Sequence, residues 1–414
     1  MINCRNNIFT LFALLLCVSC LLEESYSISG IDYFLYLCFA IVSVVWSLRN
    51  RISFPSNYWK LFLSLLLVIG INQIINPYST KLAYFVIGTI CTSLPFIHYI
   101  LSYGYRFEEK DIKFFFACMM KIVILISLIP FVESFVLRNV ETTDAILGSN
   151  IIRMGFYASL CNVCLIFSLA LYYNKRCKKY LCYGLLYIFI PVVIVQVKAI
   201  LGSILIMVSF YYFTSRKSKT ILYTSFLVSL SIPILFSIPQ FSNKISGQVN
   251  NYLSEEAKEG TARTVLYLTA FKIANDKFPF GSGQGTFGSL PSNMYESPVY
   301  EDYGIDKVWG LSYDNDVNFR FDTHWSSILG ECGYLGAIIY LLLFFYPLKK
   351  LQLRNPNKLI ASYNFVIYTT LIVIFIESFA LSLPNRLGFI FIYSGLLPLI
   401  KKRIMELSSK TIHG

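Results

Sequence analysis

The chain has 414 residues, of which 56% are hydrophobic and 14% are charged, and its formal net charge is +12. A soluble domain is about 45–50% apolar and about 25% charged. This composition leaves too little polar surface for a water-soluble globule, which excludes a soluble enzyme, a nucleic-acid-binding domain and a disordered chain. The sequence therefore predicts a polytopic membrane protein with no nucleic-acid partner.

Apolar runs long enough to cross a bilayer recur along the chain. A spanning helix needs about 20 mostly apolar residues, and this length test predicts an all-α fold of about twelve transmembrane helices. The expected spans are residues 8–22, 31–48, 59–76, 82–101, 114–136, 155–173, 180–197, 199–213, 220–238, 324–347, 359–383 and 386–400. The first run follows Arg5 and could instead be a cleaved signal peptide.

Basic residues in the loops between the spans predict the orientation. Alternate loops and the C-terminus carry about 20 basic residues, whereas the short loops on the other side carry about five. Because Lys and Arg gather in cytoplasmic loops, we expect both termini to be cytoplasmic. Residues 1–238 then hold helices 1–9, residues 239–323 form a long loop outside the cytoplasm, and residues 324–414 hold helices 10–12 and a cytoplasmic tail.

The long loop begins with a segment of helical character at residues 255–276. Its apolar residues favour an amphipathic helix that lies on the membrane surface; they are Val265, Leu268, Ala270, Phe271 and Ile273. Arg263 stands near the start of this segment. A lone Arg is often solvated, but a guanidinium also matches phosphate geometry and keeps its charge, so Arg263 is a candidate phosphate ligand.

A glycine-rich stretch, FGSGQGTFGS, follows in the same loop and contains Gly281 and Gly283. Such stretches can cradle phosphate with backbone N–H groups. No Gly-Lys-Ser/Thr follows, so it is not a P-loop. We interpret it as a tight turn that supports the site.

The long loop ends with Arg320, Asp322 and His324. The other two histidines are His98, near a helix end, and His413, in the tail, so His324 is the one imidazole expected on the outer face. A histidine titrates near neutral pH and suits general-base catalysis, and Asp322 could orient it or act as the base. We take His324 and Asp322 as catalytic candidates and Arg320 as a substrate-binding cation.

Ionisable residues inside apolar spans are further candidates because charge is costly in a membrane. Three glutamates have this property: Glu133, Glu331 and Glu377. We take Glu331 as a supporting residue, and we expect Gly333 and Gly336 beside it to allow close helix packing.

Two cations stand at expected outer helix ends, Arg153 and Lys198, and Arg386 opens the last span. Converging outer cations form an electropositive pocket for an anionic lipid head group. Cys161 and Cys164 lie within an apolar run and are interpreted as small apolar fillers, and no metal is expected.

Four stretches resemble the bacterial O-antigen polymerase and O-antigen ligase superfamily. They are RMGF, VKAILGS, ARTVLYLTAFKIANDKFPFGSGQGTFGS and DTHWSSILGECGYLG, and together they fall between about residues 150 and 346. The resemblance implies transfer of a glycan from an undecaprenyl diphosphate carrier to a sugar hydroxyl at the outer face of the bacterial inner membrane. It implies no cofactor, and its partners are the undecaprenyl diphosphate-linked oligosaccharide, membrane lipids and a chain-length regulator protein.

Two departures separate the polymerase and ligase alternatives. Ligases usually carry a His-Asn pair eleven residues before the first glycine of the GxxG that opens the next helix, and here that position holds Asp322, followed by Thr323. Ligases also commonly carry Arg where Lys198 stands. We therefore expect a polymerase, with a ligase as the alternative. A lipid-linked oligosaccharide flippase is a third, although such transporters tend to show repeated halves.

Overall fold

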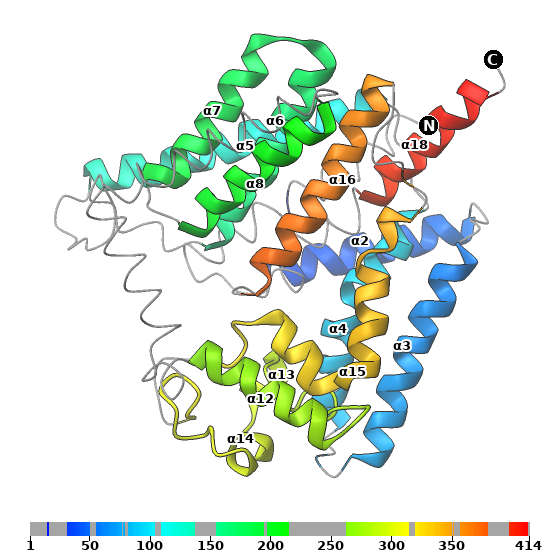
Figure 1. The fold of residues 1–414 in the computed structure, drawn as a ribbon, viewed down its shortest axis with the longest axis vertical. Helices are drawn as coiled ribbons and strands as arrows, with labels where there is room; N and C mark the ends of the chain where they lie inside the picture. Colours follow the sequence, from blue (N-terminus) through cyan, green and yellow to red (C-terminus); the bar gives the residue numbers. More distant parts are fainter. Residues whose placement is uncertain are drawn as a thin grey trace.

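The structure, a computed structural model, describes residues 31–49, 55–76, 82–103, 109–136, 155–193, 197–214, 262–313, 319–349, 357–379 and 397–412, with Leu15, Tyr78 and Leu351. Every regular element within these residues is a helix, as expected (Figure 1). The bundle helices are α2 (Ile31–Arg49), α3 (Ser56–Ile75), α4 (Leu82–Tyr103), α5 (Glu109–Val136), α6 (Gly155–Lys175), α7 (Lys178–Val193), α8 (Val197–Thr214), α15 (His324–Phe344), η1 (Tyr346–Leu348), α16 (Lys358–Glu377) and α18 (Leu397–Ile412). The shorter elements of the long loop are α12 (Ala262–Asp276), α13 (Leu290–Met294) and α14 (Pro298–Asp302).

Four of the described helices are long and apolar enough to cross a membrane. They are Ser56–Ile75 in α3, Leu82–Ser102 in α4, His324–Phe344 in α15 and Lys358–Glu377 in α16. The expected spans at 8–22 and 220–238 lie outside the described residues, and so does most of 386–400. This part of the chain has the character of a multi-pass membrane protein, and the count of twelve spans stays a prediction.

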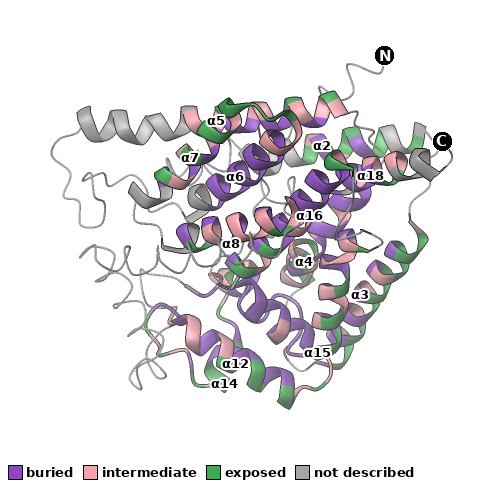
Figure 2. Ribbon diagram, turned by 45° about the horizontal axis from the view of Figure 1, so that its top comes forward, coloured by how far each residue is buried: buried purple, intermediate pink, exposed green. Residues whose placement is uncertain are grey.

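One side of α3 carries large apolar residues on an exposed surface. Trp59, Leu63, Leu67 and Ile71 recur every four residues and are 37–62% exposed. Residues four apart share one face of a helix, and Figure 2 shows exposed residues along the outer side of α3. An apolar stripe of this length is unfavourable in water and suits a surface that faces lipid tails, as the composition predicts.

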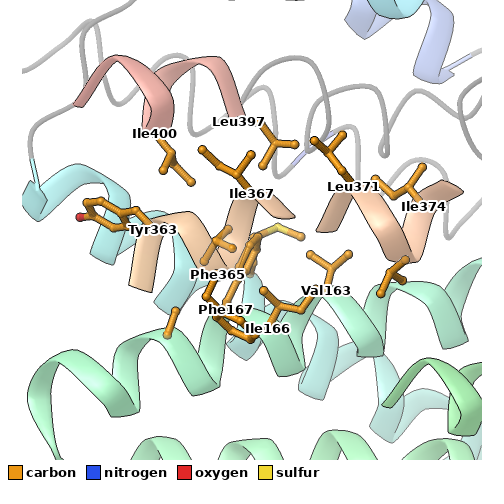
Figure 3. Packing of buried hydrophobic residues seen from close by; sticks show 14 of the residues in the cluster. Val163, Ile166, Phe167, Tyr363, Phe365, Ile367, Leu371, Ile374, Leu397 and Ile400 are labelled. Atoms are coloured by element: carbon orange, nitrogen blue, oxygen red, sulfur yellow. The ribbon is translucent and has the colours of Figure 1, made fainter. Parts of the chain in front are cut away.

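The largest buried cluster joins helices that are distant in the sequence. Residues of α6, α16 and α18 interdigitate in it, among them Phe167, Phe365 and Ile400 (Figure 3). The rings of Phe116 in α5 and Phe167 stack with centroids 4.1 Å apart. Dispersion contacts of this kind hold apolar helices together where lipid offers an equally apolar surrounding.

Residues 262–313 and 319–323 gather at one end of the bundle, called here the loop end (Figure 1). Of these residues, α12 packs along the bundle helix α15. Val265, Ala270 and Ile273 of α12 are buried as expected for its apolar face, whereas Leu268 and Phe271 are more than half exposed. The expected helix at 255–276 is thus described from Ala262 onward, and one of its apolar faces rests on protein.

The helix α15 is not the straight span that its hydropathy predicts. Gly333 has φ 62° and ψ −169°, which is far from helical, so two helical segments meet there. The imidazole Nε2 of His324 lies 2.9 Å from the hydroxyl of Tyr340, although residues 16 apart in a straight helix are about 24 Å apart. Gly333 does allow a close approach, but of the segment around Pro279 and Gly281 and not of another helix. Its positive φ also breaks α15, which the sequence analysis does not predict.

Candidate functional site

An ion pair joins the start of α12 to the start of α15 at the loop end. The guanidinium Nη2 of Arg263 donates to the carboxylate Oδ2 of Asp322 at 2.7 Å. Both side chains are slightly more than a quarter exposed, so the pair can be reached from outside the protein. Asp322 directly precedes Thr323, the N-cap residue of α15. The structure thus brings together two of the residues singled out from the sequence.

His324 occupies a different environment from Asp322. Its side chain is 1% exposed, and its Nε2 shares a hydrogen bond with the equally buried Tyr340. The ring of Trp325 lies edge-on to it at 5.1 Å. A base must come within hydrogen-bond reach of the proton it removes. Of the two candidate bases, Asp322 has the exposure for this and His324 lies inside the protein.

Arg320 is engaged within the loop. Its Nε donates to Asn293 at 2.9 Å, its Nη1 donates to the Leu311 carbonyl at 3.3 Å, and its guanidinium lies 3.8 Å from the centre of the Tyr313 ring. Burial raises the pKa of Tyr313 above its ordinary value, and its phenol donates to the Ser292 carbonyl. At 5% exposure, Arg320 holds the loop in shape.

Residues 281–289, called here the glycine segment, are all buried. Six of their backbone amides donate to atoms of the protein itself. The acceptors are Lys277 O for Gly281, Gly330 O for Ser282, Glu331 O for Gly283, Glu331 Oε1 for Phe287, Tyr300 Oη for Gly288 and Ser292 Oγ for Ser289. A phosphate cradle needs amides that face the ligand, so these amides serve the fold, in agreement with the interpretation as a turn.

The glycine segment fills the break in α15. A helix interrupted at Gly333 leaves carbonyls without their usual partners, and unsatisfied backbone groups are costly inside a membrane. The amide of Ser282 donates to the Gly330 carbonyl at 2.8 Å, and the amide of Gly283 donates to the Glu331 carbonyl at 3.1 Å. The approach needs glycine on both sides, because a Cβ on Gly281 would come within 2.5 Å of the Gly330 carbonyl and the Gly333 amide.

Glu331 completes this arrangement from the α15 side. Its side-chain Oε1 accepts from the Phe287 amide at 3.0 Å and from the Ser289 hydroxyl at 2.5 Å. These two hydrogen bonds replace those to water that the carboxylate loses on burial. Glu331 therefore supports the site at a distance by anchoring the glycine segment.

Two asparagines that sequence reasoning missed bind the start of the glycine segment, the residue before it and the break in α15. The Nδ2 of Asn72 in α3 donates to the Phe280 carbonyl at 2.6 Å and to the Glu331 carbonyl at 2.7 Å. The Nδ2 of Asn76 donates to the Gly281 carbonyl at 2.7 Å. Two amides four residues apart near the end of an apolar run, in GINQIINP, are a signal that could have found them.

Of the remaining predicted cations, only Lys198 lies among the described residues. Arg153 and Arg386 lie outside the described residues. Lys198 belongs to α8, one turn before Gly202, and Gly202 lies against Asn162 of α6 and Glu377 of α16. Since the Ser378 carbonyl accepts from the amide of His324 at 3.3 Å, this end of α8 is near the start of α15.

Neither the protein-family models nor the curated proteins compared with this chain match it. Among the described residues there is also no group of three or more His, Cys, Asp or Glu side chains that could hold a metal ion. The function therefore has to be argued from the geometry around Arg263 and Asp322.

Proposed function

We propose that the protein is a surface-polysaccharide polymerase of the bacterial inner membrane. It transfers a growing glycan from undecaprenyl diphosphate to a sugar hydroxyl of a lipid-linked repeat unit, at the outer face. The observation that carries the proposal is the Arg263–Asp322 pair, which places a fixed cation and a carboxylate 2.7 Å apart on an accessible surface at the loop end.

The two side chains suit the two charges that such a transfer moves. The acceptor oxygen forms a bond to the anomeric carbon of the donor sugar, and the bond from that carbon to the diphosphate oxygen breaks. The electron pair leaves with the diphosphate, whose developing charge a guanidinium stabilises. The acceptor hydroxyl loses its proton to the carboxylate of Asp322.

The contact between the two residues also suggests an order of events. Arg263 donates to Asp322 in the structure. A diphosphate carries more charge than one carboxylate and competes for the same donor. Binding of the donor lipid then releases Asp322 to accept the proton of the acceptor hydroxyl, so the base is activated when the leaving group is in place.

Asp322 also favours polymerase over ligase, since it stands where ligases carry His. The test is to delete the gene and separate the surface polysaccharide on a gel. A polymerase deletion leaves core plus one repeat unit, a ligase deletion leaves bare core with accumulated lipid-linked polymer, and a flippase deletion leaves unpolymerised repeat units on the cytoplasmic side. An unchanged ladder would overturn all three.

Complementation with single variants tests the site itself. Arg263→Ala and Asp322→Asn should each reproduce the pattern of the deletion. The matched control is Lys272→Ala, which removes another cation from the exposed side of α12 and should restore the full ladder. A full ladder from Arg263→Ala would remove the diphosphate role of Arg263.

A further inference from the structure

The C-terminal turn of α16 contacts both elements of the candidate site, the start of α12 and the start of α15. The last carbonyls of a helix lack partners within the helix. Here the Ser378 carbonyl accepts from the His324 amide at 3.3 Å, and the Phe379 carbonyl accepts from the Tyr267 hydroxyl at 2.9 Å. The indole Nε1 of Trp325 donates to the Phe375 carbonyl at 3.0 Å.

These contacts lie next to the ion pair along the chain. Tyr267 follows Arg263 by one helical turn on α12, and His324 follows Asp322 by two residues. Arg263 and Asp322 are therefore both located relative to the same short stretch, Ser378 and Phe379. A displacement of this stretch disturbs both attachments at once, and with them the approach of Arg263 to Asp322.

Glu377 fixes that stretch to the bundle from the opposite side. Its Oε1 accepts from the Nδ2 of Asn162 in α6 at 2.8 Å, and the Asn162 Oδ1 accepts from the hydroxyl of Ser203 in α8 at 3.0 Å. Glu377, Asn162 and Ser203 are at most 6% exposed. A Cβ on Gly202 would be 2.2 Å from the Asn162 Nδ2, so α8 approaches this cluster only because residue 202 is glycine.

A carboxylate is a costly choice for this position. Replacing a buried polar or ionic group with an apolar residue of similar volume is often neutral or stabilising, and an ionisable residue within a membrane span marks function by default. The hydrogen bonds of Glu377 give what an apolar residue would not, namely a fixed direction and distance between α16, α6 and α8.

We propose that Glu377 is a positioning residue for glycosyl transfer: held by Asn162 and Ser203, it fixes the Ser378–Phe379 stretch and through it the geometry of Arg263 and Asp322. This inference rests on the proposed function. It adds a residue far along the chain from the long loop, in a different helix, that acts on the transfer without touching the sugar or the diphosphate.

The test uses an exchange of the two polar groups in the purified full-length protein. Asn162→Asp alone removes the Nδ2 donor, so the hydrogen bond to Glu377 Oε1 is lost and two carboxyl groups lie side by side. Adding Glu377→Gln restores a hydrogen bond in the opposite direction, from the glutamine amide to the aspartate, and Ser203 can still donate.

The first readout is steady-state polymerisation of a synthetic lipid diphosphate-linked repeat unit. We expect Asn162→Asp to lower kcat by about 10- to 100-fold, the size of effect that a displacement of about 1 Å produces at a reacting centre, with little change in KM. The double variant should recover most of kcat. An unchanged kcat in Asn162→Asp, or a loss that the double variant does not recover, overturns the inference.

The second readout is hydrogen exchange of the His324 amide, which needs no activity. Asn162→Asp should speed its exchange and the double variant should restore the protection; equal exchange in all variants overturns the inference. If wild type does not polymerise the substrate, the proposed function fails and exchange alone decides whether Glu377 controls residues 322–326. If Asp322→Asn abolishes polymerisation while Asn162→Asp does not lower kcat, the inference alone fails.

Discussion

The accessible position of Arg263 and Asp322 separates their effect on activity from their effect on stability. Ion pairs between partly exposed side chains contribute about 0–1 kcal/mol to folding. We therefore expect Asp322→Asn to abolish polymerisation while it shifts the free energy of unfolding by less than about 1 kcal/mol. Thermal unfolding in detergent, run beside the polymerisation assay, checks this. A variant that loses activity only in proportion to its loss of folded protein would contradict a catalytic role.

A second prediction at the residue scale concerns the left-handed backbone of Gly333. A Cβ there would lie 2.4 Å from the Pro279 carbonyl oxygen, and φ is 62°. Strained backbone alone costs about 1–3 kcal/mol, and the clash with backbone atoms adds to it. We expect Gly333→Ala to lower the unfolding midpoint strongly.

Two other glycines provide matched controls for Gly333. Gly304 has φ 67° with no atom within 4 Å of an added Cβ, so Gly304→Ala reports the strain alone. Gly70 lies within α3 and also has open space around an added Cβ, so Gly70→Ala should be neutral or stabilising by up to about 1 kcal/mol. An effect of Gly333→Ala no larger than that of Gly304→Ala would show that the close approach to Pro279 is unimportant.

At the scale of elements, the association of the glycine segment with the break in α15 depends on Asn72. Asn72→Ala would remove both of its donated hydrogen bonds and leave the Phe280 carbonyl without this donor. Each buried polar group left unsatisfied costs about 1–3 kcal/mol. We expect a loss of stability of that order and faster proteolysis within residues 277–290. Ser64→Ala, on the exposed side of the same helix, should change neither.

The helices and this association differ in how far the sequence predicts them. The hydropathy of an apolar run depends only on its own residues, so α3, α4 and α16 could be located from local composition. The contact of Asn72 with Phe280 and Glu331 joins residues more than 200 positions apart, and no local pattern encodes it. The glycines of ECGYLG are compatible with close packing or with a break, and only the arrival of the glycine segment decides between them.

The candidate site shows the same division. Arg263 and Asp322 could be singled out because charged residues are rare here and flank apolar runs. The burial of His324 could not, since it follows from the turn at Gly333 that brings Tyr340 to the imidazole. The sequence likewise indicates a surface cation at Arg320, because its contacts with Asn293 and Tyr313 exist only in the folded loop.

For the whole molecule, the uneven charge at its two ends predicts which end faces the cytoplasm. The connection between α6 and α7 carries Lys175, Arg176, Lys178 and Lys179, and it lies at the opposite end of the molecule from α12 and α14 (Figure 1). Because basic loops stay on the cytoplasmic side, we expect the loop end to face outward, where a lipid-linked glycan would be polymerised.

Labelling with a membrane-impermeant maleimide tests this orientation. Cys177 is exposed between α6 and α7, and Lys307 is exposed at the loop end. In right-side-out vesicles the reagent should modify the cysteine of a Lys307→Cys variant and leave Cys177 unmodified; in inverted vesicles the pattern should reverse. Peptide mass spectrometry distinguishes the two sites from the other cysteines. Modification of both sites from the same side would contradict a bundle that crosses the membrane between Cys177 and residue 307. Modification of Cys177 alone in right-side-out vesicles would place Arg263 and Asp322 on the cytoplasmic side, away from any outer-face acceptor.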